Sequence, residues 1–375
     1  MTGHGNHRDG AARRIPPSRD PFYERPGEVP DRPGRLLRRR EVQVDSAVAA
    51  EACQLVYSTV ASDGRIIAAS GSVLVPRAPW PGRGPRPVVS YGVCLHGLGR
   101  DNAPSHLLAD GRESEIAVIE QALGRGWAVL VADGEGLGMP GPHTYGAGRV
   151  GGRAMLDIVR AARDVTPDVD VDAPVLLWGY SEGGRNAAWA AELQPEYAPD
   201  VSLVGLAAGG VPTDLTAVVQ AIDGGFYSGL GLAVLVGLAH AYRDERLWRI
   251  LNERGLAAAT VAATLDVVGL VLTHPQPLAS HTVRERPWEE PIWSALLERE
   301  RNPAAAPRVP VLIYHSSADD IIPLHLSSDL AAAYEAMGAR VVFAEIDSPD
   351  HLSGVADGAA PALTWLAGCL ADTWS

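Results

Sequence analysis

The stretch that decides the fold runs from Pro174 to Gly184 and reads PVLLWGYSEGG. Its apolar first half predicts a buried strand, and the residues from Glu182 onward predict a helix. Between them, Ser181 is the centre of a G-x-S-x-G motif, in which a strand turns at once into a helix. This turn forces its central residue into a strained conformation, and Gly179 and Gly183 have no β-carbon to obstruct it. The side chain of Ser181 is therefore expected to stand above a sheet as a nucleophile.

Further apolar runs before and after this stretch alternate with helical patterns. The expected strands are residues 55–60, 72–75, 87–91, 127–132, 174–178, 311–314 and 341–344. The expected helices are residues 113–124, 151–163 and 182–194. The first two strands are joined by the turn Ser62-Asp63-Gly64, which predicts an antiparallel hairpin. The later alternation predicts an α/β fold of the α/β-hydrolase type, with a mostly parallel sheet flanked by helices.

The alternation stops between about residues 218 and 307, where the pattern is helical. We interpret this part as a helical cap inserted between two strands of the sheet. The predicted organisation is an extended or disordered N-terminal segment (1–40), a first part of the core (41–215), the cap or lid (216–307) and a second part of the core (308–375). The apolar cap runs 232–236 and 267–272 are interpreted either as the wall of an acyl tunnel or as ordinary helix core.

A nucleophilic serine needs an acid and a histidine, which follow it in this order in the predicted fold. Asp319 and Asp320 come shortly after the expected strand 311–314, and we favour Asp319, with Asp320 as a solvated helix cap. Only His325 and His351 come later in the chain. His325 lies at an expected helix start and is interpreted as a surface or capping residue. His351 lies in the loop after the last expected strand, where the general base belongs.

Ester cleavage also needs backbone N–H donors for the oxyanion. One is expected from Glu182, directly after the nucleophile, and the other from the glycine-rich loop 92–99. Within this loop, the amides of Leu95 to Leu98 all remain candidates. A second glycine motif at 136–141 fits G-x-G-x-x-G, but Pro140 removes an amide that a phosphate would need, so we interpret it as a bend.

The composition limits the partners. A net charge of −13 argues against nucleic acid or an anionic membrane as the main partner. Three widely spaced cysteines indicate neither a zinc site nor a disulfide framework, and no metal is expected. No apolar run of signal-peptide length stands near the start, so the chain as written is expected in the cytoplasm. The apolar stretch 255–273 contains Asp266 and predicts a buried or amphipathic helix rather than a membrane span.

From Asp20 onward the sequence resembles the secretory lipase family, which includes the fungal A-type lipases and actinobacterial relatives. The resemblance is carried by DPFY at 20–23, VVSY at 88–91, APS at 103–105, GEGLG at 134–138 and the long segment 179–212 that begins GYSEGG. It implies a capped α/β-hydrolase that cleaves acylglycerols or related carboxylic esters through an acyl-enzyme, without a cofactor. Carried over residue by residue, it places the triad on Ser181, Asp319 and His351, and the oxyanion amides on Glu182 and on His96, or alternatively Leu95.

The sequence departs from the family pattern in the oxyanion loop, which reads Val93-Cys94-Leu95-His96-Gly97 where His-Gly-Thr-Thr-Gly is common. Asn102 stands where the family usually has a cysteine, so a disulfide of secreted members is expected to be missing. The family is usually secreted, and this chain shows no such signal. The expected partner is an acyl ester or lipid, with transient contact to a lipid interface. The alternatives are an acyltransferase, a peptidase, or a non-catalytic lipid-binding protein on the same fold.

Overall fold

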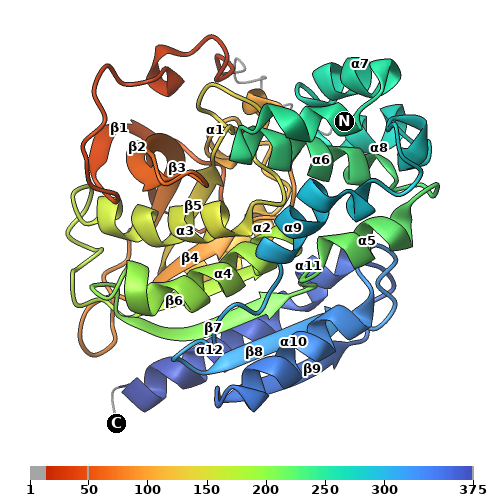
Figure 1. Ribbon diagram of the computed structural model, residues 1–375. Helices are drawn as coiled ribbons and strands as arrows, with labels where there is room; N and C mark the ends of the chain where they lie inside the picture. Colours follow the sequence, from red (N-terminus) through yellow and green to blue (C-terminus); the bar gives the residue numbers. More distant parts are fainter. Residues whose placement is uncertain (1–13, 49, 374–375) are drawn as a thin grey trace, which may run out of the picture.

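Among the described residues, 14–48 and 50–373 of the computed structural model, nine strands form one mixed sheet (Figure 1). In spatial order they are β1 (Leu36–Val42), β2 (Ala50–Val60), β3 (Ile66–Pro76), β5 (Ala128–Gly134), β4 (Val88–Gly92), β6 (Val175–Tyr180), β7 (Leu203–Gly209), β8 (Val311–Ser316) and β9 (Val341–Ile346). The first four pair antiparallel, and the other neighbours pair parallel. The expected mostly parallel sheet with an N-terminal hairpin is confirmed.

Helices cover both faces of this sheet (Figure 1). One face is covered by α3 (Gly148–Ala162), α4 (Glu182–Tyr197) and α10 (Leu324–Ala336), and the other by α2 (Ile116–Gly124) and α12 (Ala359–Thr373). In β6, Leu177 packs with the first group and Leu176 with the second. This alternation is that of a strand buried on both faces. Two shorter core helices are α1 (Pro104–Ala109) and α11 (Ser353–Asp357).

The sequence patterns do not predict strand β7, which reads LVGLAAG. Its glycines and alanines have low strand propensity. In the structure β7 lies between β6 and β8, and a β-carbon on Gly209 would lie 2.3 Å from the ring of Tyr314 and 2.4 Å from that of Tyr180. The small residues of this strand therefore leave room for two tyrosine rings, a tertiary requirement that local propensity does not reveal.

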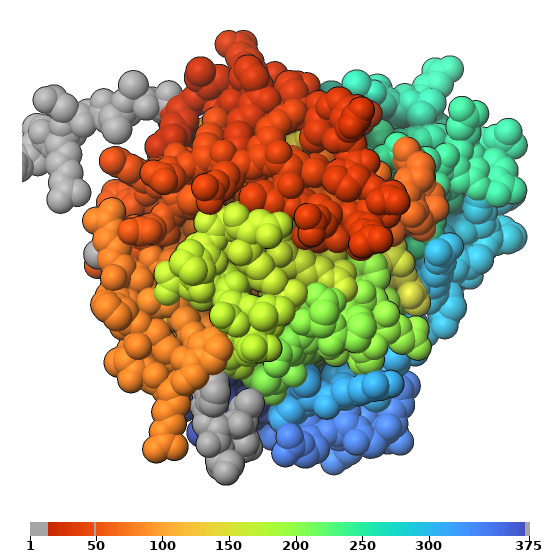
Figure 2. Space-filling model, turned by 90° about the vertical axis from the view of Figure 1, so that its left-hand side faces the viewer, coloured from red at the N-terminus to blue at the C-terminus, as the bar shows by residue number. Residues whose placement is uncertain are grey.

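The N-terminal segment was expected to be extended or disordered over residues 1–40, of which 1–13 lie outside the described residues. Its described part contains a 3-10 turn at Pro21–Tyr23 and the start of β1. Arg40 forms an ion pair of 2.7 Å with Asp20, and the hydroxyl groups of Tyr23 and Ser105 lie 2.9 Å apart. Figure 2 shows this part of the chain, in red, spread over the upper part of one face. The DPFY and APS motifs thus meet in the fold.

The chain between β7 and β8 contains helices and no named strand in this described stretch. They are α5 (Leu215–Ile222), α6 (Gly229–Tyr242), α7 (Glu253–Ala262), α8 (Val267–Thr273) and α9 (Pro291–Arg299), with 3-10 turns at Glu245–Ile250, Leu278–Ser280 and Pro287–Glu289. They gather at one end of the molecule (Figure 1). Their apolar side chains form a separate cluster, which includes Leu95 and Leu98 of the loop after β4 and Ile321 and Ile322 of the loop after β8.

The two apolar runs in this helical segment differ in their packing. Residues 232–236 of α6 are all buried in the cluster, which favours the interpretation as ordinary helix core. In α8, Leu270 and Val271 are buried, whereas Val268 and Leu272 are 60% and 64% exposed. None of the helices in the described part of the chain combines the length and the apolar character that a bilayer crossing requires.

Candidate active site

Ser181 occupies the turn between β6 and α4. Its backbone has φ 57° and ψ −124°, a strained conformation for a residue with a side chain. A β-carbon on Gly183 would lie 1.9 Å from the carbonyl oxygen of Gly92, and one on Gly179 would lie 2.5 Å from the carbonyl carbon of Gly183. Both glycines are therefore required by the close approach of β4, β6 and α4, and the expected strand–turn–helix is confirmed.

Asp319 and His351 meet at the same edge of the sheet. Asp319 follows β8 and His351 follows β9, so both lie beyond the carboxyl ends of parallel strands, as Ser181 does. The distance between Asp319 Oδ2 and His351 Nδ1 is 2.6 Å. The ring of His351 lies 5.1 Å from the ring of Tyr180, the residue before Ser181. The structure thus brings His351 beside the strand end that carries the serine.

The two neighbouring aspartates differ in their surroundings. The side chain of Asp319 is fully buried, and its Oδ1 accepts hydrogen bonds from the amides of Ile321 (3.0 Å) and Ile322 (2.7 Å). Asp320 is exposed and accepts a hydrogen bond of 3.2 Å from the backbone N–H of His351. Asp319 therefore contacts the imidazole ring of His351, and Asp320 contacts the backbone of the loop that carries His351.

A second histidine holds Asp319 from the other side. His315 Nε2 lies 3.1 Å from Asp319 Oδ2, and both side chains are fully buried. Burial alone would raise the pKa of Asp319, but the hydrogen bonds from His315 and His351 hold it well below its usual range. Asp319 is therefore an ionised acceptor. His351 Nδ1–H donates to it, which leaves Nε2 of the ring as the atom that can take a proton.

The loop after β4 is hydrogen-bonded to the turn between α7 and α8. The amides of Leu98 and Gly99 donate to the carbonyl of Leu265 (3.0 and 3.1 Å), and the amide of Val267 donates to the carbonyl of His96 (3.0 Å). The Leu98 amide is therefore already used. Among the described residues, none accepts a backbone hydrogen bond from Leu95, His96 or Gly97, so three of the four candidate oxyanion amides remain.

The side chain of His96 is buried in an ion pair that the sequence did not suggest. Nδ1 lies 2.8 Å from the carbonyl oxygen of Cys94, and Nε2 lies 3.0 Å from both carboxylate oxygens of Glu113. Because both ring nitrogens face acceptors, both carry a proton. Burial opposes this charge, but the carboxylate of Glu113 outweighs it and raises the pKa of His96 to about 9.

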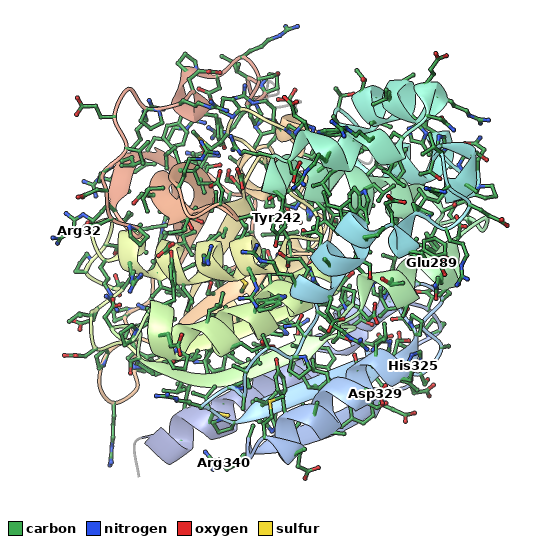
Figure 3. All side chains as sticks on the ribbon, in the orientation of Figure 1. Arg32, Tyr242, Glu289, His325, Asp329 and Arg340 are labelled. Carbon is green, nitrogen blue, oxygen red and sulfur yellow. The ribbon has the colours of Figure 1, made fainter. Side chains whose placement is uncertain are left out.

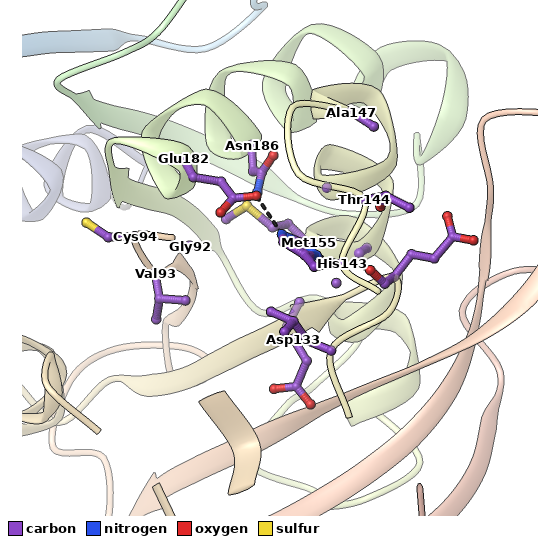
Figure 4. Close-up of a pocket in the computed structure, with 16 residues that line it drawn as sticks. Gly92, Val93, Cys94, Asp133, His143, Thr144, Ala147, Met155, Glu182 and Asn186 are labelled. Carbon is purple, nitrogen blue, oxygen red and sulfur yellow. Dashed lines mark hydrogen bonds and ion pairs between the residues drawn. The ribbon is translucent and has the colours of Figure 1, made fainter. Parts of the chain in front are cut away.

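Glu182 forms a second buried pair of the same kind. Its Oε1 lies 2.7 Å from Nε2 of His143, whose Nδ1 lies 3.0 Å from the carbonyl oxygen of Glu135. Burial alone would lower the pKa of His143. The negative charge of Glu182 and its hydrogen bond with His143 outweigh burial and raise this pKa. Figure 4 shows the pair at the edge of a cavity of about 30 Å³, which Cys94 and Asn186 also line. A space of this size, with the polar groups of His143, Glu182 and Asn186 in its wall, can hold one or two water molecules.

One group of side chains has the composition of a metal site. His96, Glu113 and Glu115 bring ligand atoms within 4.8 Å of one another. However, the amide of Cys94 (2.8 Å) and the hydroxyl of Tyr91 already donate to the Glu115 carboxylate, and Nε2 of His96 already faces Glu113. The donor set is thus closed by its own hydrogen bonds, and an imidazolium cannot bind a metal ion.

Other residues singled out in the sequence lie elsewhere. His325 is exposed on α10 (Figure 3), in agreement with its interpretation as a surface residue. The glycine motif at 136–141 forms turns before α3, as expected of a bend. Cys53 and Cys94 are free thiols, and Asn102 donates a hydrogen bond of 3.2 Å to Leu265.

A family profile described as "Secretory lipase" matches residues 103–373. Lipase 6 of Candida albicans is 30% identical over 94% of this chain and 81% of its own length. A protein named "probable inactive lipase" from Mycobacterium tuberculosis is also 30% identical, over 94% of this chain and 82% of its own. The X-ray structure of Candida antarctica lipase A in its closed state superposes with a TM-score of 0.86 at 26% identity, covering 96% of this chain and 88% of that one.

Proposed function

The chain belongs to the secretory lipase family, and from this premise we propose that Ser181, His351 and Asp319 are the catalytic triad of an ester hydrolase. The hydrolase class and the α/β-hydrolase fold follow from the family and its relatives. The observation that supports the triad is the 2.6 Å contact between Asp319 and His351 at the edge where the strained Ser181 stands.

The proposed reaction uses these groups in two steps. His351 Nε2 takes the proton of Ser181 Oγ while Oγ attacks the ester carbonyl, and the ionised Asp319 stabilises the imidazolium that forms. The backbone amides of Glu182 and His96 bind the oxyanion. The alcohol leaves with the proton from His351. Water then attacks the acyl-enzyme with the same histidine as base, which releases the carboxylic acid and restores the serine.

The first test is hydrolysis of p-nitrophenyl butyrate by wild type and Ser181→Ala. Loss of the nucleophile is expected to lower kcat by at least about 1,000-fold. Ser202→Ala, exposed before β7 at the opposite edge of the sheet, serves as the matched control and is expected to keep full activity. A fluorophosphonate probe should label wild type and not Ser181→Ala. Equal hydrolysis by both proteins would refute the triad.

The same probe separates the hydrolase from a non-catalytic protein, a distinction that matters because one relative carries the name of an inactive lipase. A wild-type protein that neither hydrolyses esters nor reacts with the probe would be of that kind. Added butanol tests acyl transfer, since a transferase would form the butyl ester in preference to the free acid.

The proposed substrate is an acylglycerol or related lipid ester, reached by transient contact with a lipid surface. Support comes from four apolar side chains that are 45–64% exposed on the consecutive helices α7 and α8: Leu256, Val261, Val268 and Leu272. Large apolar side chains exposed on helices of the segment that borders the site are available for contact with a lipid surface.

The lipid contact is tested with the double variant Val268→Ser and Leu272→Ser. It is expected to hydrolyse emulsified tributyrin several-fold more slowly than wild type and to keep its rate on soluble p-nitrophenyl butyrate, because only the lipid contact is weakened. Val342→Ser, 48% exposed on the edge strand β9, is the control. Equal loss on both substrates would show that the two residues act on the site rather than on the lipid surface.

A further inference from the structure

Both residues assigned here as oxyanion donors have charged side chains that are buried and paired. His96 and Glu182 would contribute only their backbone N–H groups to the oxyanion, so their side chains are free to serve another purpose. Each is held by a residue of opposite charge within 3.0 Å, His96 by Glu113 and Glu182 by His143. All four side chains are at most 10% exposed. Hydrogen bonds between charged partners are the strongest that a protein offers for fixing an orientation.

We propose that Glu113 and His143 are positioning residues of the oxyanion hole, which hold the amides of His96 and Glu182 through the side chains of those two residues. The inference rests on the proposed function and deepens it. Neither residue touches the substrate in this proposal.

The contacts around His96 fix the peptide groups on both sides of its amide. The Cys94 N–H donates to Glu115 (2.8 Å), and the Cys94 carbonyl accepts from the His96 ring (2.8 Å). The His96 carbonyl accepts from the amide of Val267 (3.0 Å). The peptide group between these anchored ones, Leu95–His96, carries the N–H that the proposed mechanism uses. Its orientation is therefore set by the neighbours, and the ring held by Glu113 is one of the anchors.

Glu113 is itself well placed to hold a charge. It precedes α2, whose N-cap is Glu115, and its Oε1 accepts a hydrogen bond of 3.0 Å from the backbone N–H of Glu115. Carboxylates at a helix N-terminus are stabilised by the helix dipole. The anchor of His96 thus lies in the segment just before α2, is hydrogen-bonded to the N-cap of that helix, and is separate from the loop that it positions.

His143 connects the two sides of the oxyanion hole. Its side chain donates to Glu182 (2.7 Å), the residue after the nucleophile. Its backbone N–H donates to the carbonyl of Leu98 (2.9 Å), in the loop that carries His96. One residue therefore bridges the start of α4 and the oxyanion loop, and its loss is expected to let the two donors move relative to each other.

The test compares Glu113→Gln, Glu113→Asp, His143→Gln and His143→Leu with wild type. Glu192→Gln is the matched control. Glu192, on α4, is a buried carboxylate like Glu113, but it accepts hydrogen bonds from Tyr334 and Asn302 instead. Three quantities are measured: kcat and KM on p-nitrophenyl butyrate, and Ki for an alkyl trifluoromethyl ketone. Ser181 Oγ adds to the carbonyl carbon of this ketone, its proton passes to His351, and the carbonyl oxygen becomes an anion that needs the same two amides.

Mispositioned donors are expected to lower kcat by about 10-fold or more, since a shift of about 1 Å costs this much or more in rate. KM is expected to stay within about 2-fold, because the ground-state ester gains little from the oxyanion donors. The ketone Ki should rise in step with the fall in kcat/KM. His143→Gln, which keeps an N–H donor, should retain more activity than His143→Leu.

Two results would overturn the proposal. In the first, the folded Glu113 and His143 variants keep kcat and the ketone Ki within about 2-fold of Glu192→Gln. In the second, KM rises in the folded Glu113 and His143 variants while kcat stays at the value of Glu192→Gln. If Glu113→Gln or His143→Leu does not fold, Glu113→Asp and His143→Gln decide by the same criteria. Ser181→Ala is assayed in parallel: its full activity would refute the proposed triad, whereas an inactive Ser181→Ala beside fully active Glu113 variants would refute the positioning role alone.

Discussion

The buried pair of His96 and Glu113 should make the stability of the protein depend on pH between about 6.5 and 9. The folded pKa of His96 is about 9, against 6.5 for an ordinary histidine, because the Glu113 carboxylate more than offsets the effect of burial. A group whose pKa is raised on folding contributes its full stabilisation below the unfolded pKa and loses it as the pH rises through the folded pKa. A shift of this size corresponds to about 3 kcal/mol.

The perturbation is Glu113→Gln, which keeps the shape of the side chain and removes its charge. Below pH 6.5 the variant lacks the ion pair and is expected to be less stable than wild type. This difference should shrink by up to about 3 kcal/mol as the pH rises past 9, because His96 then loses its charge in wild type as well. The remaining negative group near His96, Glu115, is present in both proteins and limits the full size of the change.

The measurement is urea unfolding followed by the fluorescence of the nine tryptophans, at several pH values between 6 and 10. Groups that titrate alike in both proteins, such as His143, cancel in the difference between the two curves. Glu192→Gln controls for the loss of any buried carboxylate. If the difference between wild type and Glu113→Gln stays constant over this range, His96 is not a charged partner of Glu113 in the folded protein, and the reasoning fails.

Three further predictions follow from other contacts. Gly183→Ala should unfold well below the wild-type temperature and lose hydrolysis, because its β-carbon would lie 1.9 Å from a backbone oxygen. Gly368→Ala meets nothing within 4 Å and lies inside helix α12, so it should unfold at the wild-type temperature or slightly above it. Burial raises the pKa of Asp133 to about 6 from 3.8, so the free energy of unfolding should fall by up to about 3 kcal/mol as the pH rises from about 4 to 6. Asp133→Asn should not show this fall. If the free energies of unfolding of wild type and Asp133→Asn follow parallel curves against pH, the prediction is wrong. Asp319→Asn, which removes the proposed orienting charge, should lower kcat on p-nitrophenyl butyrate by about 10,000-fold, and a wild-type kcat would exclude that role.

The parts of the site that could be predicted are those that local sequence patterns determine. A strand, a tight turn and a helix are all visible in residues 174–184, and the close contact between Gly183 and Gly92 explains why the motif needs glycine. Asp319 and His351 each follow a predicted strand in the C-terminal part of the chain, and in the structure Asp319 Oδ2 lies 2.6 Å from His351 Nδ1. Strand β7 was not predicted because its small residues, which leave room for the neighbouring tyrosine rings, have low strand propensity.

The residues that hold the site in place could not be predicted in the same way. Glu113 is 17 positions from His96, and His143 is 39 positions from Glu182. Neither spacing corresponds to a helix turn or a strand alternation, so only the fold brings the partners together. His315 lies only four positions before Asp319, so the pair could have been considered from the sequence. A histidine at a strand end, however, gives no local sign of which carboxylate it faces.

The helical segment between β7 and β8 holds the loop after β4, which carries the proposed oxyanion amides, through backbone hydrogen bonds. Leu265 accepts from the amides of Leu98 and Gly99, and Val267 donates to the carbonyl of His96. A β-carbon on Gly97 would lie 2.4 Å from the Leu265 carbonyl oxygen, so the two chain segments are in direct backbone contact. The turn between α7 and α8 cannot leave this position without either breaking these hydrogen bonds or moving the loop with it. The ion pair between His96 and Glu113 opposes the second course, because it ties the loop to the segment that leads into α2. If the predicted lid opens at this turn, we therefore expect these hydrogen bonds to break, while the contacts of His96 with Glu113 and of His143 with Glu182 hold the proposed oxyanion amides in place.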